Sequence, residues 1–177
     1  MAKPSDKTDW STGSGGSASV AGIEVRPATP ADAAPISRLI DSLAEYFLAD
    51  LERPQDATAF FATTAPEAVA GRLADPRYRY HVALAAGRLV GCAATRDGTH
   101  LYQLFVERAH QGAGLGRRLW EVAYRAAGSP VPATVNASLY AVPFYRRLGF
   151  VVTGSVETKD GIAYQPMCLD KNRGADD

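Results

Sequence analysis

Cysteine, histidine and long apolar runs are scarce in this chain of 177 residues, and each scarcity excludes a class of protein. Cys92 and Cys168 lie far apart, which excludes a disulfide-stapled miniprotein and predicts two reduced thiols in a cytoplasmic protein. The three histidines have no metal-ligand spacing, so we expect no metal site. No run reaches the ~18 apolar residues that span a membrane, and no apolar segment follows the N-terminal lysines. We therefore expect neither a membrane partner nor a secretory signal.

Net charge is absent as well, since 19 basic residues balance 19 acidic ones. Bulk electrostatic attraction to nucleic acid is therefore not expected. Lysine is also rare and occurs only at Lys3, Lys7, Lys159 and Lys171, so arginine supplies most of the positive charge. Because the planar guanidinium of arginine matches phosphate oxygens, arginine is the side chain that we expect beside a phosphate.

The apolar content of 46% is that of a globular protein, and a single domain of ordinary size accounts for most of the chain. Residues 1–22 are rich in serine and glycine, which predicts a flexible tail. Residues 23–172 are expected to form the domain, and residues 173–177 a short C-terminal tail.

The order of apolar patterns within the domain predicts an α/β fold. Three strand-like runs separated by short turns indicate an antiparallel meander, and residues 53–65 have no clean period. We expect a mixed, mostly antiparallel central sheet flanked by helices on both faces. The expected strands cover residues 23–26, 80–86, 89–96, 100–106, 134–137, 150–158 and 162–169, and the expected helices begin near residues 30, 66, 114 and 142.

The most informative segment joins the strand that ends at Val106 to a turn with three glycines, which opens a helix. Backbone N–H groups can point into one cavity there, because Gly112, Gly114 and Gly116 carry no side chains. A helix N-terminus adds about half a positive charge, and Arg117 adds a full one. The segment therefore predicts a site for a pyrophosphate.

Two other phosphate-binding motifs do not fit this segment. A Walker A loop requires Gly-Lys-Ser/Thr, and the chain has Leu115-Gly116-Arg117 instead. A dinucleotide fingerprint needs a third glycine where Leu119 stands and an acidic residue about 20 residues further on. No acidic residue lies between Glu121 and Glu157, which argues against a ribose clamp.

The turn Gln111-Gly112-Ala113-Gly114-Leu115-Gly116 resembles the Gln/Arg-x-x-Gly-x-Gly/Ala signature of the GNAT superfamily of acyl-CoA N-acyltransferases. The segment from Asn136 to Phe150 is similar to the region that carries the family's CoA-contacting Asn and its Ala-x-x-Phe-Tyr-x-x-x-Gly-Phe element. The resemblance covers about residues 23–170. It implies a GNAT fold, acetyl-CoA as co-substrate and direct transfer of its acetyl group to an amine.

The resemblance also implies roles for individual residues. Phe105 and Val106 would offer main-chain contacts to pantetheine, and the Val106 N–H would polarise the thioester carbonyl. Asn136 would hydrogen-bond the cofactor arm. Tyr145 would contact the cofactor and act as the general acid that protonates the leaving thiolate. The pyrophosphate would be held by Gln111, Gly112, Ala113, Gly114, Leu115, Gly116 and Arg117.

The sequence leaves the general base open. His100 is one candidate, because period-two counting places it on one face of its strand with Tyr102, Leu104 and Val106. Glu45 is a second candidate. A chain of water molecules to bulk solvent needs no residue.

The resemblance implies an acceptor pocket built by the first two helices, their connection and the final hairpin. Carboxylates with aromatic side chains suit a cationic amine, so we expect a small cationic acceptor bound by Glu45, Tyr46 and Tyr164. The alternatives are a protein lysine or N-terminal acetyltransferase and a non-catalytic acyl-CoA-binding sensor. A homodimer is compatible with the sequence. These segments also supply Asp41, Asp50, Glu52, Phe60, Phe61 and Tyr78.

Overall fold

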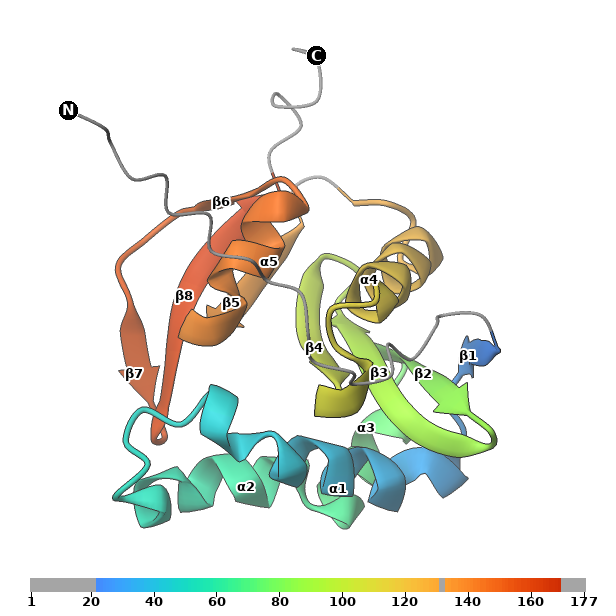
Figure 1. Ribbon diagram of the computed structural model, residues 1–177, viewed down its shortest axis with the longest axis horizontal. Coiled ribbons are helices and arrows are strands. Elements are labelled where there is room, and N and C mark those ends of the chain that lie inside the picture. Colours follow the sequence, from blue (N-terminus) through green and yellow to red (C-terminus); the bar gives the residue numbers. More distant parts are fainter. Residues whose placement is uncertain (1–21, 131–132, 170–177) are drawn as a thin grey trace, which may run out of the picture.

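The computed structural model of this chain describes residues 22–130 and 133–169 (Figure 1). Both predicted tails lie largely outside these residues. Within the described part, eight strands form one sheet in the order β1-β2-β3-β4-β5-β8-β6, and β7 also pairs with β8. The strands are β1 (Ile23–Pro27), β2 (Tyr78–Ala85), β3 (Arg88–Arg96), β4 (His100–Val106), β5 (Thr134–Ser138), β6 (Phe150–Val152), β7 (Glu157–Lys159) and β8 (Ile162–Leu169).

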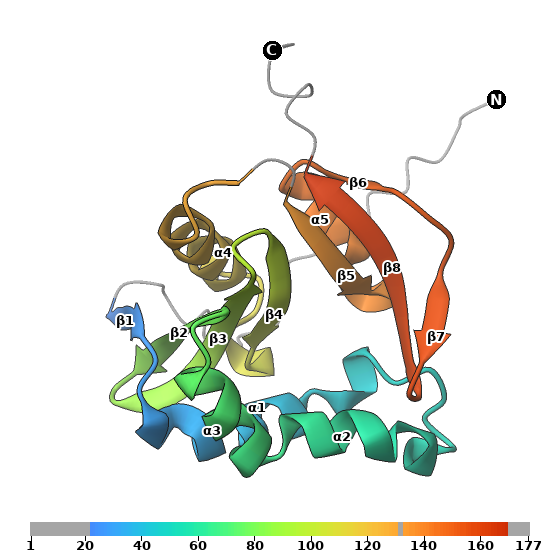
Figure 2. The ribbon, with the colours of Figure 1, turned by 180° about the vertical axis from the view of Figure 1, so that it is seen from behind.

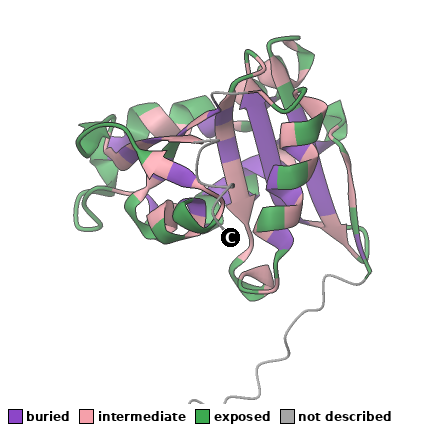
Figure 3. Ribbon diagram, turned by 90° about the horizontal axis from the view of Figure 1, so that it is seen from above, coloured by how far each residue is buried: buried purple, intermediate pink, exposed green. Residues whose placement is uncertain are grey.

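Helices cover both faces of the sheet, which confirms the predicted fold class. The helices are α1 (Ala33–Ser42), α2 (Thr58–Thr64), α3 (Pro66–Ala74), α4 (Leu115–Ala126) and α5 (Val142–Arg147). One buried cluster joins α1 and α3 to β2 and β3, and a second lies beneath α4. A third cluster joins β5 and β8 to α5. Seen from above, buried residues gather on the strands and exposed ones on the outer faces of the helices (Figure 3).

Every strand pair is antiparallel except β4 with β5. This mixed, mostly antiparallel sheet agrees with the prediction. The central strands are buried on both faces, and the fully buried Val82, Val90 and Cys92 come from β2 and β3. None of the helices in the described ranges is long and apolar enough to cross a membrane.

The first helix is shorter than the sequence predicts, because apolar residues recur at spacings of three and four from Ile36 to Phe47. Leu43 and Phe47 are buried as expected, but α1 ends at Ser42, whose Oγ donates a hydrogen bond to the Leu39 carbonyl oxygen at 2.7 Å. A serine that bonds back to the preceding turn competes with continued α-helix. The chain then continues as the 3-10 turn Ala44–Tyr46.

Residues 53–65, which lack a clean period, contain the additional helix α2. Its adjacent Phe60 and Phe61 both pack against the α1–α3 cluster, so the segment shows no alternation of buried and exposed positions. Threonines at both ends of this helix further weaken its helical signal. The least exposed positions, Ala57, Phe60, Phe61 and Thr64, lie on one helix face. Only the two phenylalanines among them are strongly apolar, so the sequence shows no clear helical period.

The predicted strand over residues 150–158 is divided into β6 and β7. Both pieces pair with β8: β7 pairs with its beginning, around a turn at Asp160–Gly161 that the sequence predicts, and β6 pairs with its end. Pro166 of β8 has no N–H for a continuous ladder. The Gln165 side chain instead donates to the carbonyl oxygen of Gly154, in the segment between β6 and β7, at 2.7 Å.

Candidate active site

The sheet opens between β4 and β5. These parallel strands pair only at His100–Thr134 and Leu101–Val135, and beyond this point they diverge (Figures 1 and 2). A cavity of about 1010 Å³ is lined by both strands, the glycine turn, α5, the end of α1, α2 and the β7–β8 hairpin. This opening is where the candidate site lies.

A β-bulge at Tyr102 changes which way the side chains of β4 point. Gln103 is paired with Ala94, but Leu101 is paired with Thr95, so Tyr102 is an extra residue. Tyr102 accordingly packs against the α1–α3 cluster, whereas Leu104 and Val106 pack beneath α4. The period-two count that placed Tyr102 on one face with Leu104 and Val106 is therefore wrong.

Strand register also fixes the direction of the main chain near the end of β4. The Glu107 N–H donates to the Val90 carbonyl oxygen at 2.8 Å. Because antiparallel residues exchange hydrogen bonds at alternate positions, Phe105 directs its main chain toward Cys92 of β3. Leu104 and Val106 direct theirs away from β3, toward the opening.

The glycine turn presents open backbone at the start of α4. Gly112 and Gly114 have φ values of +78° and +90°, and a Cβ on either residue would meet no atom within 4 Å. Gly114 is the N-cap of α4, so the unpaired N–H groups of the first helical turn face the same space. The Gln111 side chain holds the turn, because its Nε2 donates to the Val106 carbonyl oxygen at 2.9 Å.

Tyr145 is a buried residue of α5 that borders the cavity. Its ring packs against Phe144 and Phe150. Its hydroxyl has no hydrogen-bond partner among the described residues, so it is available to a ligand in the cavity. Burial raises the pKa of this phenol above its ordinary value, which keeps the proton in place at neutral pH.

His100 lies at the paired end of β4, roughly 20 Å along the strand from Val106. Its Nδ1 is 2.9 Å from Thr134 Oγ1. Burial, assisted by the charge of Arg96, lowers the pKa of His100. The ring is therefore neutral at pH 7, and it occupies the end of the cavity opposite the glycine turn.

Most predicted site residues line the cavity, but Glu45, Ala113 and Leu115 do not. Leu115 is buried beneath α4, and Glu45 is exposed and pairs with Arg108 at 3.6 Å. The predicted residues that line the cavity are Tyr46, His100, Phe105, Val106, Gln111, Gly112, Gly114, Gly116, Arg117, Asn136, Tyr145 and Tyr164.

The structure adds lining residues that the sequence did not single out as a site. Tyr140 connects two walls, because its ring lies 4.4 Å from that of Tyr46 and its hydroxyl donates to Gln111 Oε1 at 3.2 Å. Gln103 is held by the Tyr80 hydroxyl at 2.9 Å. The predicted residue Tyr164 donates to Glu157, its cross-strand partner in the β7–β8 hairpin, at 2.7 Å. The contacts of Tyr140 and Gln103 join residues at least 23 positions apart in the chain, so no local sequence signal indicates them.

The mixed sheet and the glycine turn between β4 and α4 are features that the resemblance led us to expect of an acyltransferase. A family model described as Acetyltransferase (GNAT) domain matches residues 48–171. The chain therefore belongs to the GNAT acetyltransferase family and is an acyltransferase. This family agrees with the expectation of acetyl-CoA as co-substrate.

Solved structures share this fold. A GCN5-related N-acetyltransferase from Rhodopseudomonas palustris is 23% identical, with a TM-score of 0.67 over 84% of this chain and 95% of that one. The PaiA N-acetyltransferase of Thermoplasma acidophilum, in complex with coenzyme A, is 14% identical, with a TM-score of 0.63 over 81% and 97%. An aminoglycoside 6'-N-acetyltransferase complexed with coenzyme A is 14% identical, with a TM-score of 0.59 over 82% and 95%.

The cysteines carry a prediction that bears on any assay of released thiol. Cys92 is fully buried, and burial raises its pKa to about 12, so its thiol resists ionisation. We expect a thiol reagent to leave Cys92 unmodified in the native protein and to modify it after denaturation. Peptide mapping of the modified residues checks this, and fast native modification of Cys92 would contradict the buried placement.

Proposed function

We propose that this chain transfers the acetyl group of acetyl-CoA directly to a primary amine of a small molecule. The observation that carries the proposal is a single cavity that runs from the glycine turn, through the split between β4 and β5, to a covered end beneath the β7–β8 hairpin. One end suits a pyrophosphate and the other a small acceptor.

The residues present fit acetyl-CoA. The backbone at Gly112 and Gly114 has room for phosphate oxygens, and Arg117 and Arg147 line the same end of the cavity. Coenzyme A in the Thermoplasma acidophilum and aminoglycoside enzymes supports this assignment. Asn136 is exposed on β5 and lines the cavity, so we assign it to the cofactor arm.

The main chain of β4 supplies the polarising group for the reaction. Leu104 and Val106 direct their N–H groups toward the opening, and we assign these donors to pantetheine and to the thioester carbonyl. A fixed N–H donor stabilises the negative charge that develops on this oxygen as the amine attacks. Phe105, whose main chain faces β3, contributes its side chain to the wall instead.

Tyr145 supplies the proton for the leaving group. As the bond from the acetyl carbon to sulfur breaks, the phenol donates its proton to the sulfur, and the new bond joins that carbon to the amine nitrogen. We assign the proton lost by the amine to water in the cavity. His100 is too far along β4 from Val106 to accept it directly.

The covered acceptor end favours a small molecule over a peptide, which needs a groove open at both ends. The hairpin tip is fixed to the α1–α2 connection by its main chain. Ala49 N donates to the Gly161 carbonyl oxygen at 2.9 Å, and Ala163 N donates to the Phe47 carbonyl oxygen at 3.3 Å. Leu48 and Ile162 form a β-bridge between these contacts.

The residues that line this cavity do not support the expectation that the acceptor is cationic. Of the acidic residues that suggested it, Asp41, Glu45, Asp50 and Glu52, none lines the cavity. Asp160 is the only carboxylate among the described lining residues. We therefore propose a small amine as the acceptor, without a second positive charge on that molecule.

Substitution of Gly161 by alanine tests the covered end. A Cβ there would lie 2.5 Å from Ala57 N and Asp56 C, so the hairpin tip must move. We expect kcat/KM for the amine to fall about 10- to 100-fold, since small displacements of positioning groups cost this much. KM for acetyl-CoA should stay unchanged.

Gly87→Ala is the matched control for this change. Gly87 sits in another hairpin turn with a φ of +77°, close to the +74° of Gly161, but a Cβ on it would meet no atom within 4 Å. Equal losses of amine turnover in both variants would show that backbone strain, and not the covered acceptor end, causes the effect.

A panel of acceptors tests the proposed function as a whole. CoA release would be followed by thiol detection with polyamines, aminoglycosides, amino acids and short peptides, and with acetyl-CoA alone as the blank. We expect release with a class of small amines and none with peptides. CoA release with peptides alone would favour a protein acetyltransferase. Binding of acetyl-CoA without CoA release from any acceptor would favour a sensor.

A further inference from the structure

A cluster of positive charge lies beside the paired end of β4, on the side of the cavity away from the glycine turn. The guanidinium carbons of Arg72 and Arg96 each lie 5.5 Å from the centroid of the Tyr102 ring. Tyr102 is the bulge residue of β4, and it lines the cavity together with Arg96 and Thr63. The bulge thus turns a tyrosine toward two arginines on the acceptor side.

The charge of this cluster is poorly compensated by the protein. Arg72 donates to two neutral groups, the Tyr80 hydroxyl at 3.1 Å and the Thr63 carbonyl oxygen. No carboxylate lies within 4 Å of Arg72 among the described residues. In the part of the chain that the structure describes, the one carboxylate that pairs with Arg96 belongs to its exposed neighbour Asp97, at 3.5 Å. An exposed pair of this kind contributes little.

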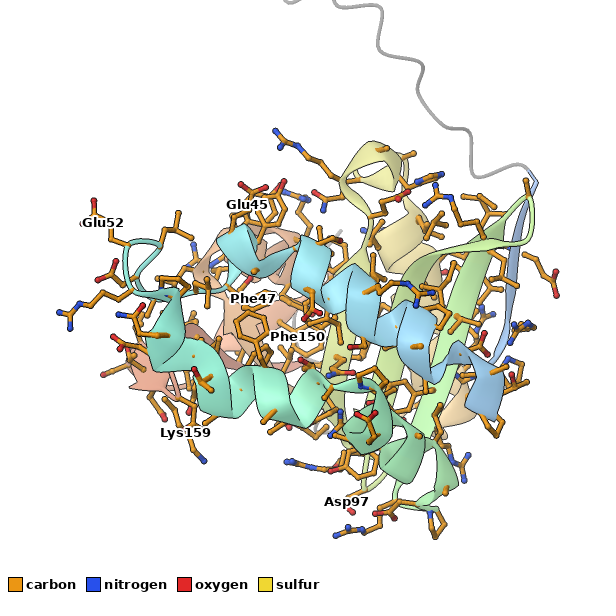
Figure 4. All side chains as sticks on the ribbon, turned by 90° about the horizontal axis from the view of Figure 1, so that it is seen from below. Glu45, Phe47, Glu52, Asp97, Phe150 and Lys159 are labelled. Atoms are coloured by element: carbon orange, nitrogen blue, oxygen red, sulfur yellow. The ribbon has the colours of Figure 1, made fainter. Side chains whose placement is uncertain are left out.

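The remaining charges of the cavity do not neutralise the cluster. Asp160, the one lining carboxylate, lies beside Lys159 in the β7–β8 hairpin, at the beginning of α2. The cluster lies at the other end of α2, where Thr63 accepts from Arg72, and this helix is about 10 Å long. Figure 4 shows the two regions through Lys159, near the start of α2, and Asp97, beside α3.

We propose that the acceptor carries a carboxylate in addition to its amine, and that Arg96 binds this carboxylate next to the Tyr102 ring. This proposal rests on the proposed function and names the substrate class of the same cavity. Arg96 provides the charge-assisted contact, while Arg72 adds positive potential and holds Tyr102 in place. His100, neutral beside Arg96, adds no charge of its own.

Spacing along β4 limits the length of such an acceptor. Leu104, whose N–H points into the opening, lies two residues from Tyr102, which is roughly 7 Å in a strand. An amine at the reaction centre and a carboxylate at Arg96 must therefore be separated by several bonds. Unbranched ω-amino acids of increasing length are suitable probes for this separation.

The test compares each ω-amino acid with its amide, which has the same length and no negative charge. For the best length we expect the wild-type protein to prefer the acid by about tenfold or more in kcat/KM, because hydrogen bonds to charged groups are strong. Arg96→Gln should bring this ratio close to one, because kcat/KM for the acid falls much further than kcat/KM for the amide, which has no negative charge to pair with a guanidinium. Arg96→Lys, which keeps the charge, should retain part of the preference.

Arg77→Gln is the control, because Arg77 is an exposed arginine near Tyr78 that does not line the cavity. This variant should keep the full preference for the acid. A wild-type ratio near or below one would overturn the proposal, as would equal losses of acid and amide turnover in Arg96→Gln.

Binding measurements separate a failure of this proposal from a failure of the proposed function. If no amine is acetylated, the proposed function is wrong, and calorimetry on the protein saturated with CoA still compares acid with amide. Tighter binding of the acid that disappears in Arg96→Gln would support the carboxylate site. Equal binding of acid and amide would refute it.

Discussion

Tyr145→Phe is expected to lower kcat by about 100-fold or more, the usual contribution of a positioned general acid. KM for acetyl-CoA should change little, because the ring keeps its packing against Phe144 and Phe150. The removed hydroxyl has no partner among the described residues, so the free energy of unfolding should be nearly unchanged. Steady-state kinetics and chemical denaturation measure the two effects separately.

The matched control is Tyr124→Phe. Tyr124 packs against the same buried cluster and stacks on Trp120 at 4.7 Å, but it does not line the cavity. We expect this variant to retain wild-type kcat. Full activity in Tyr145→Phe would refute the assignment of the general acid, and an equal loss in both variants would indicate a structural effect.

Gly114→Ala is expected to raise KM for acetyl-CoA by about 10- to 100-fold, the equivalent of one or two charge-assisted hydrogen bonds. Gly114 is the N-cap of α4 with a φ of +90°, and its missing Cβ points into open space at the proposed pyrophosphate site. A methyl group there would keep phosphate oxygens away from the first N–H groups of the helix. Affinity for acetyl-CoA can be measured by calorimetry.

Gly128→Ala provides a closely matched comparison at the other end of the same helix. Gly128 has a φ of +89°, and a Cβ on it would likewise meet no atom within 4 Å. Both variants should lose about 1–2 kcal/mol of stability from left-handed backbone strain. Only Gly114→Ala should lose affinity for acetyl-CoA, and unchanged affinity there would contradict the placement of the pyrophosphate.

The glycine turn that borders the cavity could be predicted from sequence because its geometry depends on local backbone chemistry. The glycines at 112 and 114 require conformations that other residues avoid, and the strand before them and the helix after them are contiguous in the chain. Their arrangement follows from the order of residues. The main-chain direction of Phe105 could not be predicted, because it depends on the register of β4 against β3.

The acceptor side could not be predicted to the same extent, because its residues meet through tertiary contacts. The bulge at Tyr102 interrupts the period-two pattern on which the reasoning about His100 rested, and no residue type signals it. Gly161 is correctly predicted as a hairpin turn, but its contact with Asp56 and Ala57 depends on how a distant segment folds. Glu45 was predicted to bind the acceptor because of its place near the end of the first helix, but its carboxylate pairs with Arg108 instead.

We propose that acetyl transfer from acetyl-CoA to a small amine takes place in the cavity between β4 and β5. Quantifying CoA and the acetylated amine together by mass spectrometry, for the wild-type protein, Tyr145→Phe and Gly114→Ala, tests it most directly. We expect equimolar formation of the two products by the wild type and slow formation by both variants, with excess acetyl-CoA restoring the rate only in Gly114→Ala. Tight binding of acetyl-CoA with no acetylated small amine from any acceptor would contradict it.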